Sequence, residues 1–166
     1  PISTSGAWDY TLDNTKSAVQ ALGAGKTATD TLTVNSKDGT ASQAITVTIT
    51  GVNDQATITG TLTGSVTEDS AAKASGTLSV ADVDTGEAVF QTPASLAGNY
   101  GTFTFNATSG AWDYTLDSTK SAVQALGAGK TATDTLTVSS KDGTDSQTIT
   151  VTITGVNDQA TITGTL

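Results

Sequence analysis

The stretch AITVTIT at residues 44–50 alternates apolar residues with threonine. Side chains on a strand point alternately to opposite faces of a sheet, so this pattern predicts a strand that is half buried in a sandwich. The pattern returns at residues 149–154 and, in shorter form, at residues 31–34. The pair Asp38-Gly39 lies between residues 31–34 and 44–50 and favours a tight hairpin. We therefore predict that these two segments are adjacent antiparallel strands.

A period of two residues continues through most of the chain. Further strands are predicted at residues 56–66, 75–80, 101–106 and 110–116, separated by short segments rich in glycine, serine and aspartate. The fold class is therefore all-β, an antiparallel β-sandwich. The aromatic side chains of the second half are expected to pack in its core, because they lie on strand-like segments: Tyr100, Phe103, Phe105, Trp112 and Tyr114.

Only residues 119–126, matched by residues 15–22, have helical spacing. Ala122, Val123 and Leu126 form the apolar side of this predicted helix, and Gly127 ends it after about two turns. We expect the helix to cross between two sheets.

The sequence contains a long internal repeat. Residues 3–62 return almost unchanged at residues 107–166, and Trp8 recurs 104 residues later as Trp112. This period is the length of one β-sandwich domain. Five positions differ between the copies: Ser3 and Ala107, Asn14 and Ser118, Asn35 and Ser139, Ala41 and Asp145, Ala44 and Thr148. Enzymes are seldom built from near-identical tandem copies, whereas long surface fibres are.

The joint between units is predicted at Gly51–Gln55, where polar residues end the strand, and again at Gly155–Gln159. Residues 55–157 then form a complete repeat, residues 1–54 the C-terminal half of a preceding repeat, and residues 158–166 the first strand of the next. A register that takes residues 1–104 as the unit is the alternative. A half-sandwich exposes strand edges and an open core. We expect neighbouring repeats of the same chain, or strand exchange with another copy, to complete it.

Composition narrows the possible functions. The chain has no cysteine, methionine, histidine or arginine, so disulfides, thiol nucleophiles, imidazole bases and the usual zinc sites are excluded. We expect no enzyme. The net charge of −9 argues against nucleic acid and anionic membranes as partners and makes a divalent cation the natural counterpart. No apolar run approaches the length of a membrane span, so no membrane insertion is expected in this segment.

The motifs Glu68-Asp69, Asp82-Val83-Asp84, Lys141-Asp142-Gly143 and Val156-Asn157-Asp158 occur in the order seen in cadherin-type domains. The whole repeat resembles the VCBS and other Ig-like or cadherin-like extender repeats of giant bacterial RTX-type adhesins exported by type I secretion. The resemblance implies an extracellular, calcium-stiffened repeat on the bacterial cell surface. Many such copies hold a distal binding domain away from the cell, for adhesion or biofilm formation.

The acidic positions can also be placed from the strand order. If the first strand leaves the upstream joint and the second returns to it, acidic and amide groups gather at both ends of the sandwich. Such clusters repel unless a cation neutralises them, and calcium accepts six to eight oxygens in flexible geometry. The upstream group is Asn53, Asp54, Asp82, Asp84 and Asp142; the downstream group is Glu68, Asp69, Asn157 and Asp158.

The resemblance gives these residues the same roles: Asp82 and Asp84 as the Asp-x-Asp pair, Asp142 as the hairpin aspartate, Glu68 as the base glutamate and Asn157-Asp158 as the linker pair. It also shows departures. Gly155 stands where the cadherin linker has an acidic residue, and Asp117 lacks the glutamate that follows in the family motif, so fewer ions are expected at each joint. Asp82–Glu87 is not an EF-hand loop, because its glycine comes one position early.

Two other functions remain open at this stage. One is a glycan- or protein-binding β-sandwich module, which a binding screen of one repeat would reveal. The other is a fibre subunit that polymerises by β-strand complementation, which would give concentration-dependent polymers that persist in chelator.

Overall fold

The computed structural model describes residues 6–70 and 73–164. The chain divides into two compact units, each considered by itself below. The first contains the residues up to Asp54 together with Val83–Thr85, and the second contains Gln55–Asp82 and the residues from Gly86 onward.

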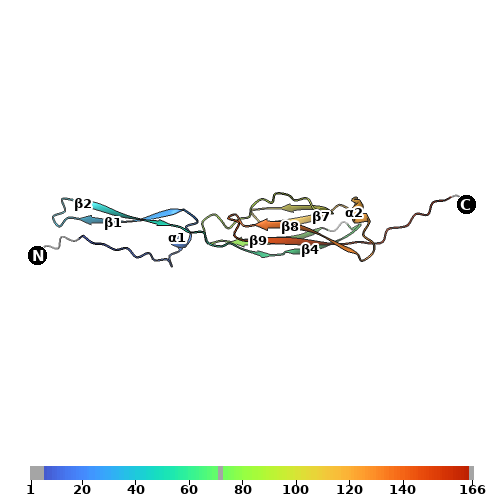
Figure 1. Ribbon diagram of the computed structural model, residues 1–166, viewed down its shortest axis with the longest axis horizontal. Helices are drawn as coiled ribbons and strands as arrows, with labels where there is room; N and C mark the ends of the chain where they lie inside the picture. The colour runs from blue at the N-terminus through green and yellow to red at the C-terminus, as the bar shows by residue number, and fades with distance from the viewer. Residues whose placement is uncertain (1–5, 71–72, 165–166) are drawn as a thin grey trace. The chain divides into compact units, whose positions relative to one another are not determined.

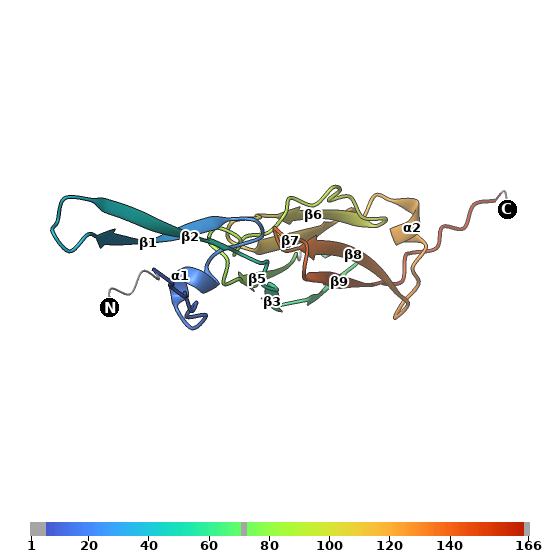
Figure 2. The same cartoon turned by 60° about the vertical axis from the view of Figure 1, so that its left-hand side comes forward.

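The second unit is a sandwich of two sheets, which confirms the all-β, antiparallel prediction (Figures 1 and 2). The four-stranded sheet has the order β3-β5-β7-β6 and the three-stranded sheet the order β4-β9-β8. All neighbours are antiparallel except β4 and β9, which run parallel. The strands are β3 (Thr57–Gly60), β4 (Thr63–Thr67), β5 (Ala74–Ala81), β6 (Gly101–Phe105), β7 (Ala111–Leu116), β8 (Thr131–Ser139) and β9 (Ser146–Thr154).

The single strand predicted at residues 56–66 is wrong, because the chain changes sheets in its middle. Gly60 has a φ of 125°, and a Cβ there would lie 2.4 Å from the Thr77 carbonyl oxygen, so only glycine fits this bend. Beyond it, the Leu62 carbonyl accepts a hydrogen bond from the Thr150 amide at 2.8 Å, which starts the pairing of β4 with β9. Ile58 and Val66 are both buried, so the alternation continues across the break and conceals it in the sequence.

The core between the two sheets confirms the aromatic prediction. Trp112, Tyr114 and Phe103 are fully buried, and Tyr100 and Phe105 are partly buried against them. The Phe103 and Tyr114 rings pack with centroids 4.8 Å apart. The indole Nε1 of Trp112 donates a 2.9 Å hydrogen bond to the Thr61 carbonyl. The indole therefore fastens the bend between β3 and β4 to the core.

The short helix α2 (Ser121–Gln124) leads from β7 in one sheet to β8 in the other, which confirms the predicted crossover. It has one turn rather than two, since Ala125 already forms its C-cap. Val123 is fully buried and Leu126 is partly buried, but Ala122 is exposed, so the predicted apolar side was wrong at that position. One helical turn is enough to bury a single side chain, that of Val123, in the core.

The β8–β9 hairpin is not tight, and neither is the equivalent hairpin of the first copy, so the tight turn predicted from Asp38-Gly39 is wrong. Ser139 pairs with Ser146, so residues 140–145 form the connection, with Gly143 at a φ of 77°. The Ser140 hydroxyl hydrogen-bonds within this connection: its Oγ donates to Asp142 Oδ1 and accepts from the Asp145 amide.

The β8–β9 connection also fixes the first strand of the sandwich. Asp145 Oδ2 accepts a 2.6 Å hydrogen bond from the Ile58 amide, and Thr144 Oγ1 accepts one from the Ala56 amide at 2.9 Å. The equivalent of Asp145 in the first copy is Ala41. The substitution between the copies therefore adds an acceptor where β3 begins.

We predict that Asp145→Ala lowers the stability of the second unit by about 1–3 kcal/mol, because the Ile58 amide loses a charged acceptor. Denaturant unfolding, followed by Trp112 fluorescence in a Trp8→Phe background, measures this loss. Ala41→Asp is the matched control and should leave stability unchanged. If Asp145→Ala left the stability of the second unit unchanged, water would be shown to replace the Asp145 carboxylate as the acceptor.

The first unit contains α1 (Ser17–Gln20) and a two-stranded antiparallel sheet of β1 (Thr27–Asn35) and β2 (Ser42–Thr50). This hairpin confirms the predicted pairing of residues 31–34 with residues 44–50 (Figure 1). Each element lies 104 residues before its counterpart α2, β8 or β9. Residues 7–12 have the sequence of β7, AWDYTL, yet the structure does not place them in a strand. Among the described residues of both units, no helix is long and apolar enough to cross a membrane.

Candidate metal centre

Two loops of the second unit are held together at one end of the sandwich. After β5, residues 86–89 of this unit lie against the β8–β9 connection. Lys141 supplies both contacts: its Nζ donates to the Gly86 carbonyl at 2.6 Å, and its backbone amide donates to the Val89 carbonyl at 2.9 Å. Phe90 then forms a bridge with Ser140. The first loop is therefore fixed in position relative to the hairpin that carries Asp142.

Three carboxylates converge where these loops meet. Asp82, Glu87 and Asp142 each offer one oxygen, and these oxygens all lie within 4.8 Å of one another. All three side chains are partly buried, and Asp82 Oδ2 is buried from solvent. Calcium binds oxygens at about 2.3–2.6 Å, so ligands on opposite sides of the ion are about 5 Å apart. The spacing of the cluster matches that dimension, and an all-oxygen set is the donor chemistry that calcium prefers.

Neighbouring hydroxyl groups orient the Asp142 carboxylate. Ser140 Oγ donates to Oδ1 at 2.6 Å, and Thr144 Oγ1 donates to Oδ2 at 2.5 Å. In the first unit Asp38 has the equivalent environment. There the hydroxyl of Ser36, with the amide and hydroxyl of Thr40, lowers the pKa of Asp38 to about 2. Hydrogen bonds of this kind favour the ionised form, which is the form that binds a cation.

The structure thus brings together two residues of the predicted upstream group, Asp82 and Asp142. Asn53, Asp54 and Asp84 fall in the first unit, where the buried Asp84 carboxylate accepts a 2.9 Å hydrogen bond from the Asp54 amide. The Asn53 side-chain amide donates to the Asp54 carbonyl at 2.6 Å. These three residues remain predicted ligands.

Sequence reasoning missed Glu87 as a member of the cluster. The available signal was its place five residues after Asp82 in the same loop. Glu87 was considered only as part of an EF-hand pattern that does not match, although the loop can curl its carboxylate back toward Asp82 without that pattern.

The residues of the predicted downstream group have different environments. Glu68 is buried at the end of β4, where Oε1 accepts from Gln124 Nε2 at 3.1 Å and Oε2 accepts from the Val156 amide at 3.0 Å. Asp69 is exposed, as are Asn157 and Asp158. Glu68 therefore holds the start of the segment that follows β9. A cation site formed by the four residues of the downstream group stays a prediction.

Asp134 is a further buried carboxylate, and sequence reasoning did not identify it. It lies on β8 and accepts four hydrogen bonds: from the amides of Asn99, Tyr100 and Gly101 and from the Tyr114 hydroxyl, at 2.6–3.0 Å. Burial and the Asp134 carboxylate raise the pKa of Tyr114, so its hydroxyl remains a donor. With all these donors, Asp134 fixes the loop before β6 and is not available for a metal ion.

The family model of the bacterial cadherin-like domain matches residues 53–155, which include both loops of the acidic cluster. The chain belongs to this family. Cadherin-like domains are typically extracellular, adhesion-related structural modules without enzymatic activity, and they commonly bind calcium. No curated protein matches the sequence.

Among solved structures, mouse clustered PcdhgC3 EC1-3 is similar to this chain, with 18% sequence identity and a TM-score of 0.46. The alignment covers 89% of this chain and 47% of the mouse chain, so the cadherin-like chain described here spans about half the length of that structure.

Proposed function

We propose that this chain is part of the extender region of a large bacterial surface adhesin, and that calcium bound at the joints between repeats makes the region rigid. The observation that carries the proposal is the convergence of Asp82, Glu87 and Asp142 in a cadherin-like domain. Residues 55–157 are the repeat in this proposal, residues 1–54 belong to the preceding one, and residues 158–166 begin the next. The parent protein projects a distal binding domain from the cell for adhesion or biofilm formation.

Calcium would act here by supplying the positive charge that three neighbouring carboxylates lack. Without a cation, carboxylates this close repel, and the loop that carries Asp82 and Glu87 is pushed away from the hairpin that carries Asp142. With calcium, both segments share one ion and move together. A repeat end that is mobile in the free protein becomes stiff, and the acidic joints Asn53-Asp54 and Asn157-Asp158 would extend this stiffness from repeat to repeat.

We predict that calcium raises the melting temperature of the second unit. At a concentration a hundredfold above Kd, binding stabilises the folded state by about 2.7 kcal/mol. For a domain of this size that corresponds to a rise of roughly 10–20 °C. Differential scanning calorimetry of the full chain, in chelator and in millimolar calcium, measures the shift, and small-angle scattering of the same samples shows whether the distribution of lengths narrows.

Two variants distinguish calcium binding at the acidic cluster from a general effect of removing negative charge. Asp82→Asn with Glu87→Gln should abolish the calcium-dependent rise, and in chelator it should leave the melting temperature unchanged or higher because a repulsion is removed. Asp113→Asn is the matched control, since Asp113 is exposed on β7 outside the cluster, and it should keep the full rise. If calcium raises the melting temperature equally in both variants, the acidic cluster is not the calcium site. If calcium does not raise the melting temperature of the unmodified chain, the proposed role of calcium is wrong.

A further inference from the structure

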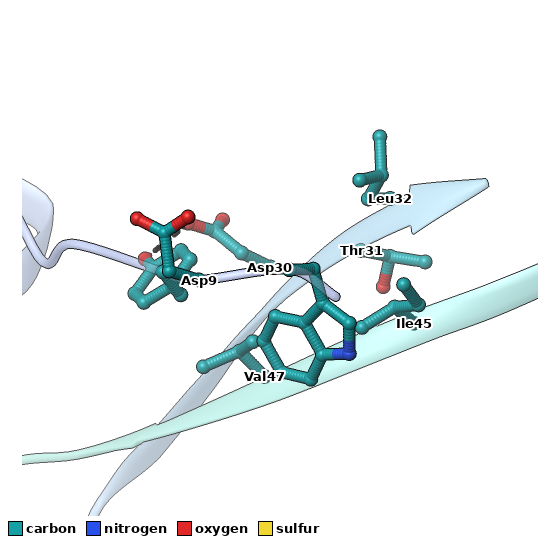
Figure 3. Close-up of a pocket in the computed structure, with 8 residues that line it drawn as sticks. Asp9, Asp30, Thr31, Leu32, Ile45 and Val47 are labelled. Carbon is teal, nitrogen blue, oxygen red and sulfur yellow. Dashed lines mark hydrogen bonds between the residues drawn. The ribbon is translucent and has the colours of Figure 1, made fainter. Parts of the chain in front are cut away.

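The first unit has an open hollow of about 270 Å³, and Asp30 and Ile45 are among the residues that line it (Figure 3). In the second unit the equivalent residues, Asp134 and Ile149, are buried inside the sandwich. The hollow therefore corresponds to the core of a complete repeat. Glu68 of the second unit is different, because this buried charge lies at the end of a strand, outside the acidic cluster.

The Glu68 carboxylate has a protein donor on each of its two oxygens. The residue follows directly after β4 and is 2% exposed. Its Oε1 accepts a 3.1 Å hydrogen bond from Gln124 Nε2, and its Oε2 accepts one from the Val156 amide at 3.0 Å. A buried charge is stable only where other groups replace the water that it has lost. Here those groups come from helix α2 and from the segment that follows β9.

Backbone contacts fix the position of Glu68. Its amide donates to the Thr154 carbonyl at 2.9 Å, directly after the paired residues Thr67 and Thr154 of the parallel strands β4 and β9. Asp69 then adopts a left-handed conformation with a φ of 55°, which aspartate tolerates better than most residues, and β4 has ended. The carboxylate is therefore held beside the point where β9 ends.

The donor on α2 is also fixed in position. Val123 is fully buried and anchors the single turn of this helix, and the next residue is Gln124. The Gln124 amide donates to the Lys120 carbonyl at 3.1 Å. The exposed Gln124 side chain therefore reaches Glu68 from a backbone that is packed against the core.

The residue before Val156 is held by the connection between α2 and β8. The Gly155 amide donates to the Lys130 carbonyl at 2.8 Å. A Cβ at Gly155 would lie 2.2 Å from the Leu126 carbonyl oxygen, so the chain passes directly against this connection. Together with the contact from Glu68, these contacts fix two successive residues after the end of β9.

We propose that Glu68 is a positioning residue of the downstream joint: held by Gln124, it clamps the Val156 amide and fixes the direction in which the chain leaves the sandwich before any cation binds. Every partner in this clamp is a protein group, so the clamp forms in the calcium-free protein. The inference goes beyond the proposed function, in which calcium supplies the stiffness. The two ends of the repeat then differ: the upstream loops need calcium to overcome the repulsion within the acidic cluster, whereas the exit of the chain is already formed. At the downstream joint, calcium would have to fix only the residues beyond Val156.

Amide hydrogen exchange of the full chain in chelator, resolved by NMR, tests this proposal. We expect the Val156 amide to be protected in the unmodified chain. Glu68→Ala should speed its exchange at least about tenfold, because a hydrogen bond to a charged group is lost. Glu68→Gln should stay closer to the unmodified chain, since its side-chain oxygen can still accept from Val156 while its Nε2 donates to the Gln124 oxygen. The Thr150 amide, which donates to the Leu62 carbonyl inside the sandwich, reports on opening of the whole unit.

Gln124→Ala provides a second test that leaves the buried residues in place. It should speed exchange at Val156 and leave Thr150 unchanged, because Glu68 loses the donor that holds its side chain. Gln20→Ala is the matched control, since Gln20 is the counterpart of Gln124 in the first copy, and it should change neither amide. If Glu68→Ala also speeds exchange at Thr150, the whole unit has been destabilised and Gln124→Ala decides.

Two results would overturn the clamp. One is a Val156 amide that exchanges freely in chelator and becomes protected only in calcium. The other is an exchange rate at Val156 that neither Glu68→Ala nor Gln124→Ala changes. Because the decisive comparison is made in chelator, a chain whose melting temperature does not respond to calcium would contradict the proposed function and leave this test unaffected.

Discussion

Asp134→Ala is expected to destabilise the second unit by at least 3 kcal/mol. The Asp134 carboxylate is buried and accepts hydrogen bonds from three successive backbone amides and from Tyr114. Alanine would leave the buried Gly101 amide and Tyr114 hydroxyl without this acceptor and would also remove the two partly buried contacts, and each unsatisfied buried group costs about 1–3 kcal/mol. Relaxation of the loop recovers part of that cost. For a domain of this size the remaining loss lowers the melting temperature by more than about 12 °C.

The internal repeat supplies the control for this experiment. Asp30→Ala removes the same residue from the same local sequence, but Asp30 is exposed and its recorded partner is the Tyr10 hydroxyl. The expected change in stability is below about 0.5 kcal/mol. Asp134→Asn should fall between the two, because its side-chain amide would face the Asn99 amide, a second donor. Equal losses for Asp134→Ala and Asp30→Ala would show that the four contacts of Asp134 contribute little.

The period of two residues predicted most strands because it follows directly from the pleat of a sheet. It identified β5, β6 and β7, and it identified β1, β2 and β9 from their threonine pattern. It could not detect the break between β3 and β4, because the inward positions stay in phase while the chain passes from one sheet to the other. The sequence signal for the break was Gly60, but the alternation of apolar and polar residues does not take glycine into account.

Local sequence also could not decide whether a segment forms a strand at all. The six residues AWDYTL form β7 at residues 111–116, between β5 and β6, but they are not in a strand at residues 7–12. The difference lies in the partners: strands are hydrogen-bonded to neighbours, and the described part of the first unit provides none for these residues. Tertiary context therefore overrides local propensity in this protein.

The candidate site was predictable in part for a similar reason. Asp82 and Asp142 could be placed together because both follow strand ends on the same side of the sandwich. Glu87 could not, since its position depends on how the loop curls, and the Lys141 contacts fix that curl. Asp134 did carry a sequence signal, a charge at an inward position between Ala132 and Leu136. Such a charge on a buried face indicates a set of donors, which here are backbone amides that leave no pattern in the sequence.

Gly110→Ala should destabilise the second unit by about 2–5 kcal/mol. Gly110 has a φ of 69°, a conformation that costs an L-residue roughly 1–2 kcal/mol. A Cβ there would lie 2.0 Å from the Leu78 carbonyl oxygen. That oxygen belongs to β5, whose Leu78 amide is hydrogen-bonded to the Gly110 carbonyl, so the overlap can be relieved only by separating two backbones. Forced overpacking of this kind typically costs a further 1–3 kcal/mol. Urea unfolding of the Trp8→Phe chain, followed by Trp112 fluorescence, measures the loss.

Gly6→Ala is the matched control, because Gly6 is the counterpart of Gly110 in the first copy. A Cβ at Gly6 meets no heavy atom of the described residues within 4 Å, so the free chain should keep its stability. Equal losses of stability in Gly110→Ala and Gly6→Ala would show that the overlap with the Leu78 carbonyl is not the cause.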